Sequence, residues 1–249
     1  MRLLWLLIGT MVAARAVPAC ELSFAVEAEF PPHLMQQGSE WTGQSVALLQ
    51  RLAEKSGCQL RYVNSPWLRS LQQLKSGELS VVSQMSKTKS REQDVVFIGP
   101  HHTERIWLIG DPKQLPPIQS MQQLAGQLDY GRIAELNGAY YGEEFDQLKQ
   151  QPAFARQLVV ISGIQDKLAL LRAKRVNAIL EDESVLDYWQ HKGYQDANNY
   201  QKLLLVYQSP VYFGFSKKAL TAAQLDSLQQ AWQQMEQSGE VSRIQAMRW

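Results

Sequence analysis

Short apolar runs alternate along this chain, from about residue 22 onward, with longer segments whose apolar residues recur every three or four positions. The short runs are typical of strands, and the longer segments are typical of helices that bury one face. Regular alternation of the two favours an α/β protein with mainly parallel sheets flanked by helices.

The first part of the chain predicts a β-α-β-α-β unit. Its segments are a strand at 22–26, a helix around 46–53, a strand at 60–63, a helix at 68–74 and a strand at 79–83. Gly57 and Gly77 follow the two helices and are natural C-terminal stops. Two more strand-like runs, 95–97 and 106–109, precede the proline-containing stretch 111–117, where we expect the chain to cross to a second lobe.

The second part of the chain repeats the alternation and predicts a second α/β lobe. Its segments are a helix at 120–125, a strand at 128–130, a helix at 143–149, a strand at 158–161, a helix at 164–173, a strand at 176–180 and a helix at 184–191. Strand-like runs at 203–207 and 211–215 then lead into a helix at 222–235, with Thr221 as its N-cap and Gly239 just after it. This last block resembles the missing helical cover of the first lobe.

The expected division is therefore a signal peptide at 1–19, the first part of lobe 1 at 20–110, lobe 2 at 111–207, and a return to lobe 1 at 208–249. Two crossings between two lobes form a hinge. The cleft beside such a hinge is a place where small ligands bind.

The first nineteen residues differ in kind from the rest. A basic second residue, an apolar stretch at 3–14 and small residues up to Ala19 form the pattern of a secretory signal peptide. The stretch is shorter than the roughly 20 apolar residues of a spanning helix. A buried N-terminal helix is the alternative, although Arg15 and Pro18 interrupt it. We expect export to the periplasm, with cleavage after Ala16 or Ala19.

The two cysteines, Cys20 and Cys58, each precede a predicted strand of the first lobe. Neighbouring parallel strands would bring them within bridging distance, and an oxidising compartment favours a disulfide. Two unpaired buried thiols are one alternative. Acylation of Cys20 as a lipoprotein is another, although residues 17–19, Val-Pro-Ala, are a poor acylation signal.

Composition is that of an ordinary globular protein, with 45% hydrophobic and 20% charged residues in a chain of 249. A formal net charge of +1 lacks the basic field typical of nucleic-acid binders, so we expect no nucleic-acid partner. Two cysteines without a C-x-x-C pair do not support a zinc module. His101 and His102 are adjacent on a predicted strand and are expected to face opposite sides. We expect no metal and no cofactor.

Three segments are similar to motifs of the type II periplasmic solute-binding proteins of the family-3 extracellular group. Residues 86–91, SKTKSR, with VFIGP at 96–100, resemble S/T-x-T-x-x-R followed by F-S-x-P-Y. Residues 177–182, NAILED, resemble D-A-x-x-x-D, and 228–249 resemble the closing L-x-x-L…G-x-x-x-x-I…K-W pattern. The resemblance spans about 22–249. It implies a two-lobed fold that binds small polar solutes, most often amino acids, for a transporter.

The resemblance also implies three polar ligand contacts. Arg91 would hold the ligand carboxylate through a bidentate guanidinium pair, and Ser86 would add a hydroxyl. Asp182, on the second lobe, would accept the α-ammonium group, so the ligand would bridge the cleft and favour closure. The alternative for Asp182 is capping of the helix that starts near Ser184.

Aromatic and acidic contacts are implied as well. Phe30 and Trp67 match positions where the family places aromatic walls around the ligand side chain, and Glu27 stands where an acidic or polar selector often sits. Both aromatic residues could instead be ordinary core residues, because aromatic side chains bury a large area anywhere.

The sequence departs from the family pattern at several positions. Ala47 replaces an acidic residue, Gln84 stands at a usually small position, and Asn177 replaces aspartate. Residues 137–140, Asn-Gly-Ala-Tyr, stand where a Gly-Thr or Gly-Ser hydroxyl usually helps to seat the carboxylate. These changes weaken the expectation of a standard amino acid as ligand.

We expect a monomeric protein, not an enzyme, that binds a small carboxylate-containing solute for uptake and works with a membrane permease or a receptor. Motifs of hydrolases, NTPases, dinucleotide enzymes and zinc proteases are absent from the sequence. Two alternatives remain open. One is a sensory or accessory binding protein, and the other is a dehydratase-like enzyme in which Arg91, Glu27 and Asp182 support proton transfer.

Overall fold

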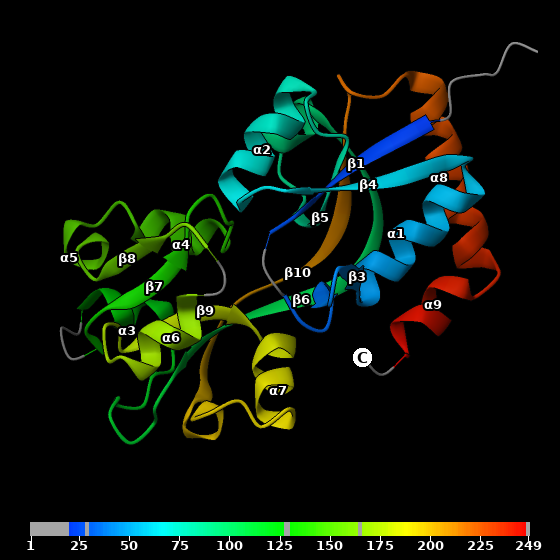
Figure 1. The fold of residues 1–249 in the computed structure, drawn as a ribbon. Coiled ribbons are helices and arrows are strands. Elements are labelled where there is room, and N and C mark those ends of the chain that lie inside the picture. Colours follow the sequence, from blue (N-terminus) through cyan, green and yellow to red (C-terminus); the bar gives the residue numbers. More distant parts are fainter. Residues whose placement is uncertain (1–19, 28–29, 127–129, 164–165, 248–249) are drawn as a thin grey trace, which may run out of the picture.

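The computed structural model describes residues 20–27, 30–126, 130–163 and 166–247 (Figure 1). The predicted signal peptide at 1–19 lies outside the described residues. None of the helices in the described part of the chain has the length and apolar character that a bilayer crossing requires.

A mixed eight-stranded sheet runs through the molecule in the order β4-β1-β5-β10-β6-β9-β7-β8. Its strands are β1 (Cys20–Val26), β4 (Cys58–Asn64), β5 (Val81–Ser86), β6 (Val95–Gly110), β7 (Ile133–Leu136), β8 (Leu158–Ile161), β9 (Ala178–Asp182) and β10 (Gln201–Ser216). Pairing is parallel within β4-β1-β5 and within β9-β7-β8, and antiparallel where β10 meets β5 and β6 and where β6 meets β9. A separate hairpin joins β2 (Met35–Gln37) to β3 (Glu40–Thr42).

Two lobes lie on either side of the long antiparallel pair β6 and β10 (Figure 1). Each of these strands has 16 residues, and the pair spans from one lobe to the other. At one end β10 pairs with β5 of lobe 1, and at the other end β6 pairs with β9 of lobe 2. The predicted two-lobed α/β fold with a two-strand hinge is confirmed. The predicted boundaries after residues 110 and 207 fall at the end of β6 and inside β10, and they stay predictions.

The helices cover the sheet on both lobes (Figure 1). They are α1 (Gln44–Lys55), α2 (Trp67–Ser76), α3 (Met121–Gly126), α4 (Glu143–Leu148), α5 (Pro152–Ala155), α6 (Asp166–Arg172), α7 (Glu183–His191), α8 (Ala222–Gln237) and α9 (Glu240–Gln245). Gly77 ends α2 with φ at 90°, a conformation that glycine adopts without strain. Thr221 and Gln224 form a capping box at the start of α8, which packs against α1.

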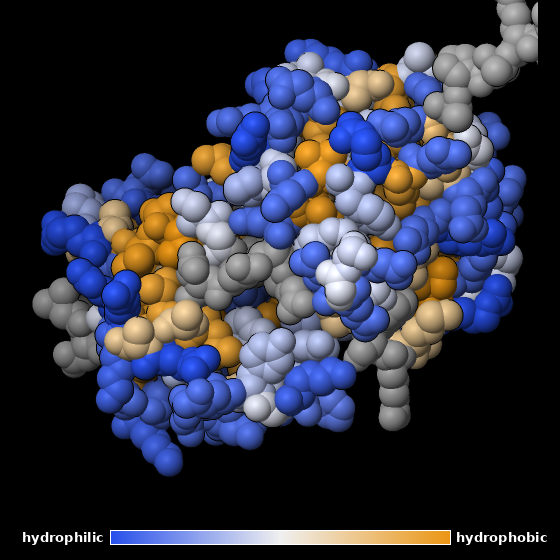
Figure 2. Space-filling model, in the orientation of Figure 1, coloured by the Kyte–Doolittle hydropathy of each residue, from blue (hydrophilic) through white to orange (hydrophobic). Residues whose placement is uncertain are grey.

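Aromatic and aliphatic residues form the core of both lobes, and one buried cluster includes residues of lobe 1 and of lobe 2. In lobe 1, β1 contributes Phe24, and α8 covers the sheet with Trp232. In lobe 2, Tyr130, Phe145 and Phe154 pack together beside β7 and β9. Figure 2 shows that this face of the molecule is mostly hydrophilic, with smaller hydrophobic patches on both lobes. The two strands that join the lobes form a hinge, the arrangement in which two lobes can close around a ligand.

One strand of lobe 2 lies away from its predicted place. The sequence predicts a strand at 128–130, of which residues 128 and 129 lie outside the described residues, whereas the strand in this part of lobe 2 is β7. The hydrophobic pattern missed β7 because Glu135 interrupts it. This carboxylate is 2% exposed and pairs with Lys149 Nζ at 2.7 Å, so a charged residue is accommodated in a buried strand.

The predicted disulfide is present. Cys20 and Cys58 are direct partners in the parallel β1–β4 register, with Cα atoms 4.4 Å apart, and their sulfur atoms are bonded. The bridge joins the first residues of two neighbouring strands, as their positions before two apolar runs indicated.

Candidate functional site

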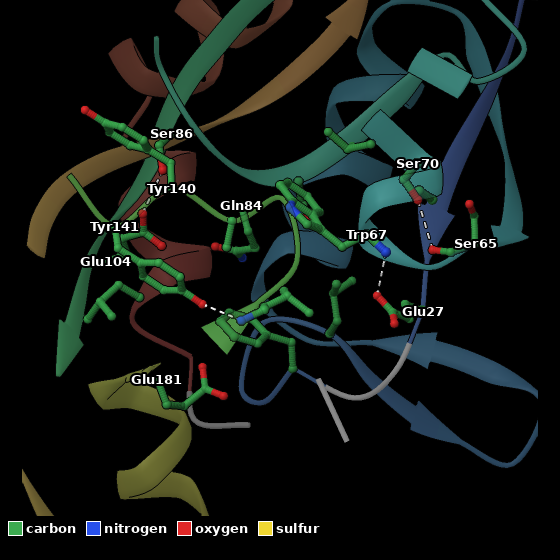
Figure 3. A pocket seen from close by; sticks show the side chains of 18 of the residues that line it. Glu27, Ser65, Trp67, Ser70, Gln84, Ser86, Glu104, Tyr140, Tyr141 and Glu181 are labelled. Atoms are coloured by element: carbon green, nitrogen blue, oxygen red, sulfur yellow. Dashed lines mark hydrogen bonds between the residues drawn. The ribbon is translucent and has the colours of Figure 1, made fainter. Parts of the chain in front are cut away.

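A cavity of about 100 Å³ lies between the two lobes at the hinge (Figure 3). Lobe 1 contributes the segment after β1, the start of α2 and the end of β5. Lobe 2 contributes the segment after β7, the start of α6 and the end of β9. Glu104 of β6 lines the cavity from one of the strands that connects the lobes.

Five of the six predicted ligand contacts line this cavity: Glu27, Phe30, Trp67, Ser86 and Arg91. They come from three separate stretches of lobe 1, which follow the parallel strands β1, β4 and β5 and meet at one edge. Carboxyl ends of neighbouring parallel strands meet at the same edge of a sheet, which is where α/β proteins place ligands. The individual roles of these residues stay predictions.

Arg91 connects the lobes across the cavity. Its Nη1 donates to the carbonyl oxygen of Ser86 at 2.9 Å, and its Nη2 donates to that of Gly138 in lobe 2 at 3.2 Å. The guanidinium lies 5.9 Å from the Trp67 ring centroid. Burial lowers the pKa of Arg91, but from so high a value that the group stays charged. Among the described residues, no carboxylate lies within ion-pair distance of Arg91.

Glu27 and Trp67 are joined by a hydrogen bond at the start of α2. The backbone N–H of Trp67 donates to a Glu27 carboxylate oxygen at 2.8 Å. Pro66, the N-cap, has no side chain that could accept this bond, so Glu27 supplies the cap from the end of β1. The indole Nε1 of Trp67 is buried without a partner among the described residues, and it is available to a ligand acceptor.

Asp182 does not line the cavity. It is 2% exposed, its Oδ1 accepts from the backbone N–H of Ser184 at 2.8 Å, and its Oδ2 accepts from that of Arg105 at 2.8 Å. Successive side chains of a strand point to opposite faces, and in β9 Glu181 is the residue that lines the cavity. Asp182 caps α7, which is the alternative that the sequence left open.

Asp182→Ala is expected to lower the free energy of unfolding by about 1–2 kcal/mol, because α7 loses its cap. Asp182→Asn is the matched control and should retain most of the stability, since asparagine is an equally good N-cap. Urea unfolding followed by circular dichroism measures both variants. Equal stability of Asp182→Ala and the parent would contradict the capping role.

Glu104 is one of the charged cavity residues that the sequence did not indicate. It is 8% exposed and accepts a hydrogen bond from Ser86 Oγ at 2.9 Å. Burial raises the pKa of Glu104 to about 8, against the smaller opposing effects of the Ser86 hydrogen bond and the Arg91 charge. Its only sequence signal is a single acid beside the strand-like run 106–109.

Three histidines, His33, His101 and His102, cluster at the hinge strand β6. The rings of His33 and His102 stack with centroids 4.1 Å apart, and the Nδ1 atoms of His101 and His102 are 3.1 Å apart. The expectation that His101 and His102 face opposite sides is wrong, because the β6–β10 register shifts next to His102 and breaks the alternation. Within the described residues no group of three or more ligands is arranged to hold a metal ion.

The sequence matches the model of the bacterial extracellular solute-binding proteins, family 3, over residues 22–249. The chain belongs to this family. Among curated protein sequences, none matches this family-3 protein.

Solved structures share the fold of this family-3 protein. An ancestral arginine-binding protein bound to arginine has a TM-score of 0.74 at 19% identity, over 90% of this chain and 96% of its own. A histidine kinase sensor domain with similarity to periplasmic binding proteins has a TM-score of 0.76 at 18% identity, and the match covers 90% of this chain and 94% of its own. The ancestral amino acid-binding protein AncCDT-1, a precursor of cyclohexadienyl dehydratase, has a TM-score of 0.71 at 18% identity, and the match covers 90% of this chain and 92% of its own.

Two charged residues that line the cavity of this family-3 solute-binding protein, one cation and one acid, form no ion pair among the described residues. Arg91 is the cation and Glu104 is the acid. Lys167 and Glu181, which also line the cavity, are already paired at 2.9 Å. The site can accept both a negative and a positive group of a small solute.

Proposed function

We propose that the protein binds a small carboxylate-containing solute, an amino acid or a related compound, between its two lobes, and does so in the periplasm for uptake. The observation that carries the proposal is the Arg91 guanidinium. It lines the interlobe cavity, is oriented by two backbone carbonyls, and has no carboxylate partner among the described residues. A planar guanidinium in such a site is suited to a carboxylate.

The size and walls of the cavity support a small solute. A single water molecule needs about 10–15 Å³ of such space, and the cavity offers about 100 Å³, so it has room for a small solute. Phe30 and Trp67 offer apolar surface for the rest of the ligand. The ancestral relative that was solved with arginine has the same fold, which is consistent with this ligand class.

Binding should favour the closed arrangement of the lobes. Arg91 of lobe 1 already donates to Gly138 of lobe 2, and residues of both lobes line the cavity. A ligand that contacts both sides has more contacts in the closed state than in the open state, and this difference drives closure. A membrane permease or a receptor that recognises the closed form is the expected partner. The disulfide and the family description fit an exported protein.

Arg91→Ala is expected to weaken binding of the carboxylate ligand at least about tenfold, because a charge-assisted hydrogen bond contributes about 1.5–3 kcal/mol and 1.4 kcal/mol is one decade. A thermal-shift screen of amino acids and small carboxylic acids first identifies the ligand, and calorimetric titration then measures the affinity. Arg91→Lys is the matched control: it keeps the charge but loses the bidentate geometry, so its affinity should fall between the two. Unchanged affinity in a folded Arg91→Ala variant would refute the proposal.

A further inference from the structure

We infer that Glu104, on the strand β6 that joins the two lobes, accepts the cationic group of the ligand, so that the site selects amino acids over carboxylic acids that lack an amine. This inference rests on the proposed function, because it needs a ligand whose carboxylate is held by Arg91. It assigns the ammonium group to the hinge strand and not to Asp182 of lobe 2.

The hydrogen bonds and ion pairs of the acids near the cavity favour Glu104 as the acceptor of a ligand cation. Both oxygens of Asp182 accept backbone N–H groups at 2.8 Å, and its side chain does not line the cavity. Glu181 accepts the backbone N–H of Asp182 and pairs with Lys167 Nζ at 2.9 Å. Glu27 caps α2.

Glu104, in contrast, has acceptor capacity left. A carboxylate offers about four acceptor positions, and the Ser86 hydroxyl occupies one of them at 2.9 Å. Among the described residues no lysine or arginine lies within ion-pair distance of Glu104. Figure 3 shows Glu104 on the same side of the pocket as Ser86 and Gln84, across from Trp67 and Glu27.

Gln84 provides a second acceptor for the same group. Its Nε2 donates to Ser45 Oγ at 2.8 Å, while its Oε1 is buried and has no partner among the described residues. Gln84 lines the cavity, as Glu104 does. A buried carbonyl oxygen without a donor is costly, and an ammonium group with three N–H donors would satisfy it together with the Glu104 carboxylate.

Binding of a cation changes the protonation of Glu104. Burial raises its pKa to about 8, so the carboxyl group is neutral at pH 7 when no ligand cation is bound. An ammonium group stabilises the ionised form, and the Glu104 proton leaves to solvent while the ligand amine keeps its own proton. The titratable and charged groups that interact with Glu104 are Arg91, which lowers its pKa, Asp182 and Glu181, which raise it, and the phenols of Tyr141 and Tyr207.

The test uses matched ligands. The twenty common L-amino acids and their des-amino carboxylic acids are titrated calorimetrically at pH 7 in two buffers of different ionisation enthalpy. We expect the best amino acid to bind at least tenfold more tightly than its des-amino counterpart and to release up to one proton. The des-amino acid should release none. Between pH 6 and 7.5 the affinity for the amino acid should rise with pH, by about tenfold per unit, as proton release requires.

Glu104→Gln is the decisive variant, because it has the size of glutamate and keeps an oxygen for the Ser86 hydroxyl. It should bind the amino acid at least tenfold more weakly, without proton release, and should bind the des-amino acid as the parent does. Asp182→Asn is the contrast and should retain both the amine preference and the proton release. The pH dependence of the parent decides the question even where Glu104→Gln does not fold.

Any other outcome contradicts either the role of Glu104 or the proposed function. If des-amino acids bind as tightly as amino acids, or if Glu104→Gln keeps the affinity and proton release of the parent, Glu104 is not the cation acceptor and the Arg91 site stands. If Asp182→Asn loses the amine preference and Glu104→Gln does not, the cation belongs to Asp182. If no member of either set binds, the proposed function itself fails.

Discussion

Replacing both Cys20 and Cys58 with serine is expected to lower the free energy of unfolding by about 3–4 kcal/mol. The disulfide closes a loop with a sequence separation of 38 residues, and cross-linking reduces the entropy of the unfolded chain by an amount that depends on loop length. For a chain of this size the change corresponds to a melting temperature about 10 °C lower. Urea unfolding and differential scanning calorimetry measure both quantities.

Reduction of the parent protein is the matched control for the double serine variant. Reductant should bring the parent to the stability of the variant, and it should leave the variant unchanged. A double serine variant that unfolds at the same urea concentration as the oxidised parent would show that the bridge between β1 and β4 does not stabilise the fold.

Acidification from pH 7 to pH 5 is expected to destabilise the protein through the histidine cluster at the hinge. Burial lowers the pKa values of His33 and His101 well below their usual range, and that of His102 to about 3. The unfolded chain therefore binds protons below about pH 6.5 that the folded chain does not, and stability falls as pH falls. The effect reaches about 2 kcal/mol for each fully buried histidine at pH 5, since one pKa unit is worth about 1.4 kcal/mol.

Glu104 acts in the opposite direction. Its raised pKa means that the folded protein binds the extra proton between about pH 4.5 and 8, so this group stabilises the fold as pH falls. A variant of one histidine separates the contribution of the cluster to the pH dependence of stability from that of Glu104. His102→Gln should reduce the loss of stability between pH 7 and 5 by about 1–2 kcal/mol, a range that allows for the partial exposure of this residue. Urea unfolding at both pH values tests this, and an unchanged loss would exclude a role of His102 in acid sensitivity.

Hydrophobic periodicity predicted the elements whose pattern is locally complete. The helices α1, α2 and α8 begin and end close to the expected residues, because glycine stops and a threonine cap mark them. The long strands β6 and β10 were each predicted as two separate runs. Pro100 and Pro210 interrupt the pattern. In the structure Pro210 pairs with Thr103, and Pro100 falls in the register shift between the His102–Val211 and Ile98–Phe213 pairs.

The candidate site shows the same limit of local reasoning. Five lining residues follow from motif positions, because their segments lie at the ends of predicted strands. Asp182 was assigned to the ligand by its motif, but the alternation along β9 turns Glu181 to the cavity instead. Glu104 could not be predicted from its local sequence. Its hydrogen-bond partner Ser86 lies 18 residues earlier in the chain, on β5, and β5 pairs with β10 and not with β6. Its environment exists only once the sheet has formed.

The pairing of β6 with β10 also bears on how this chain can be engineered. Glu104 and Ser209 are direct partners in the ladder, so the segment between them leaves and re-enters the sheet through adjacent residues. A segment with neighbouring ends can be exchanged as a cassette, because the two splice points need no new spacing between them. Replacing this segment, which forms lobe 2, with the corresponding segment of another family member would join the Arg91 side of the cavity to different lobe 2 residues. Such an exchange would change the ligand preference while lobe 1 stays as it is.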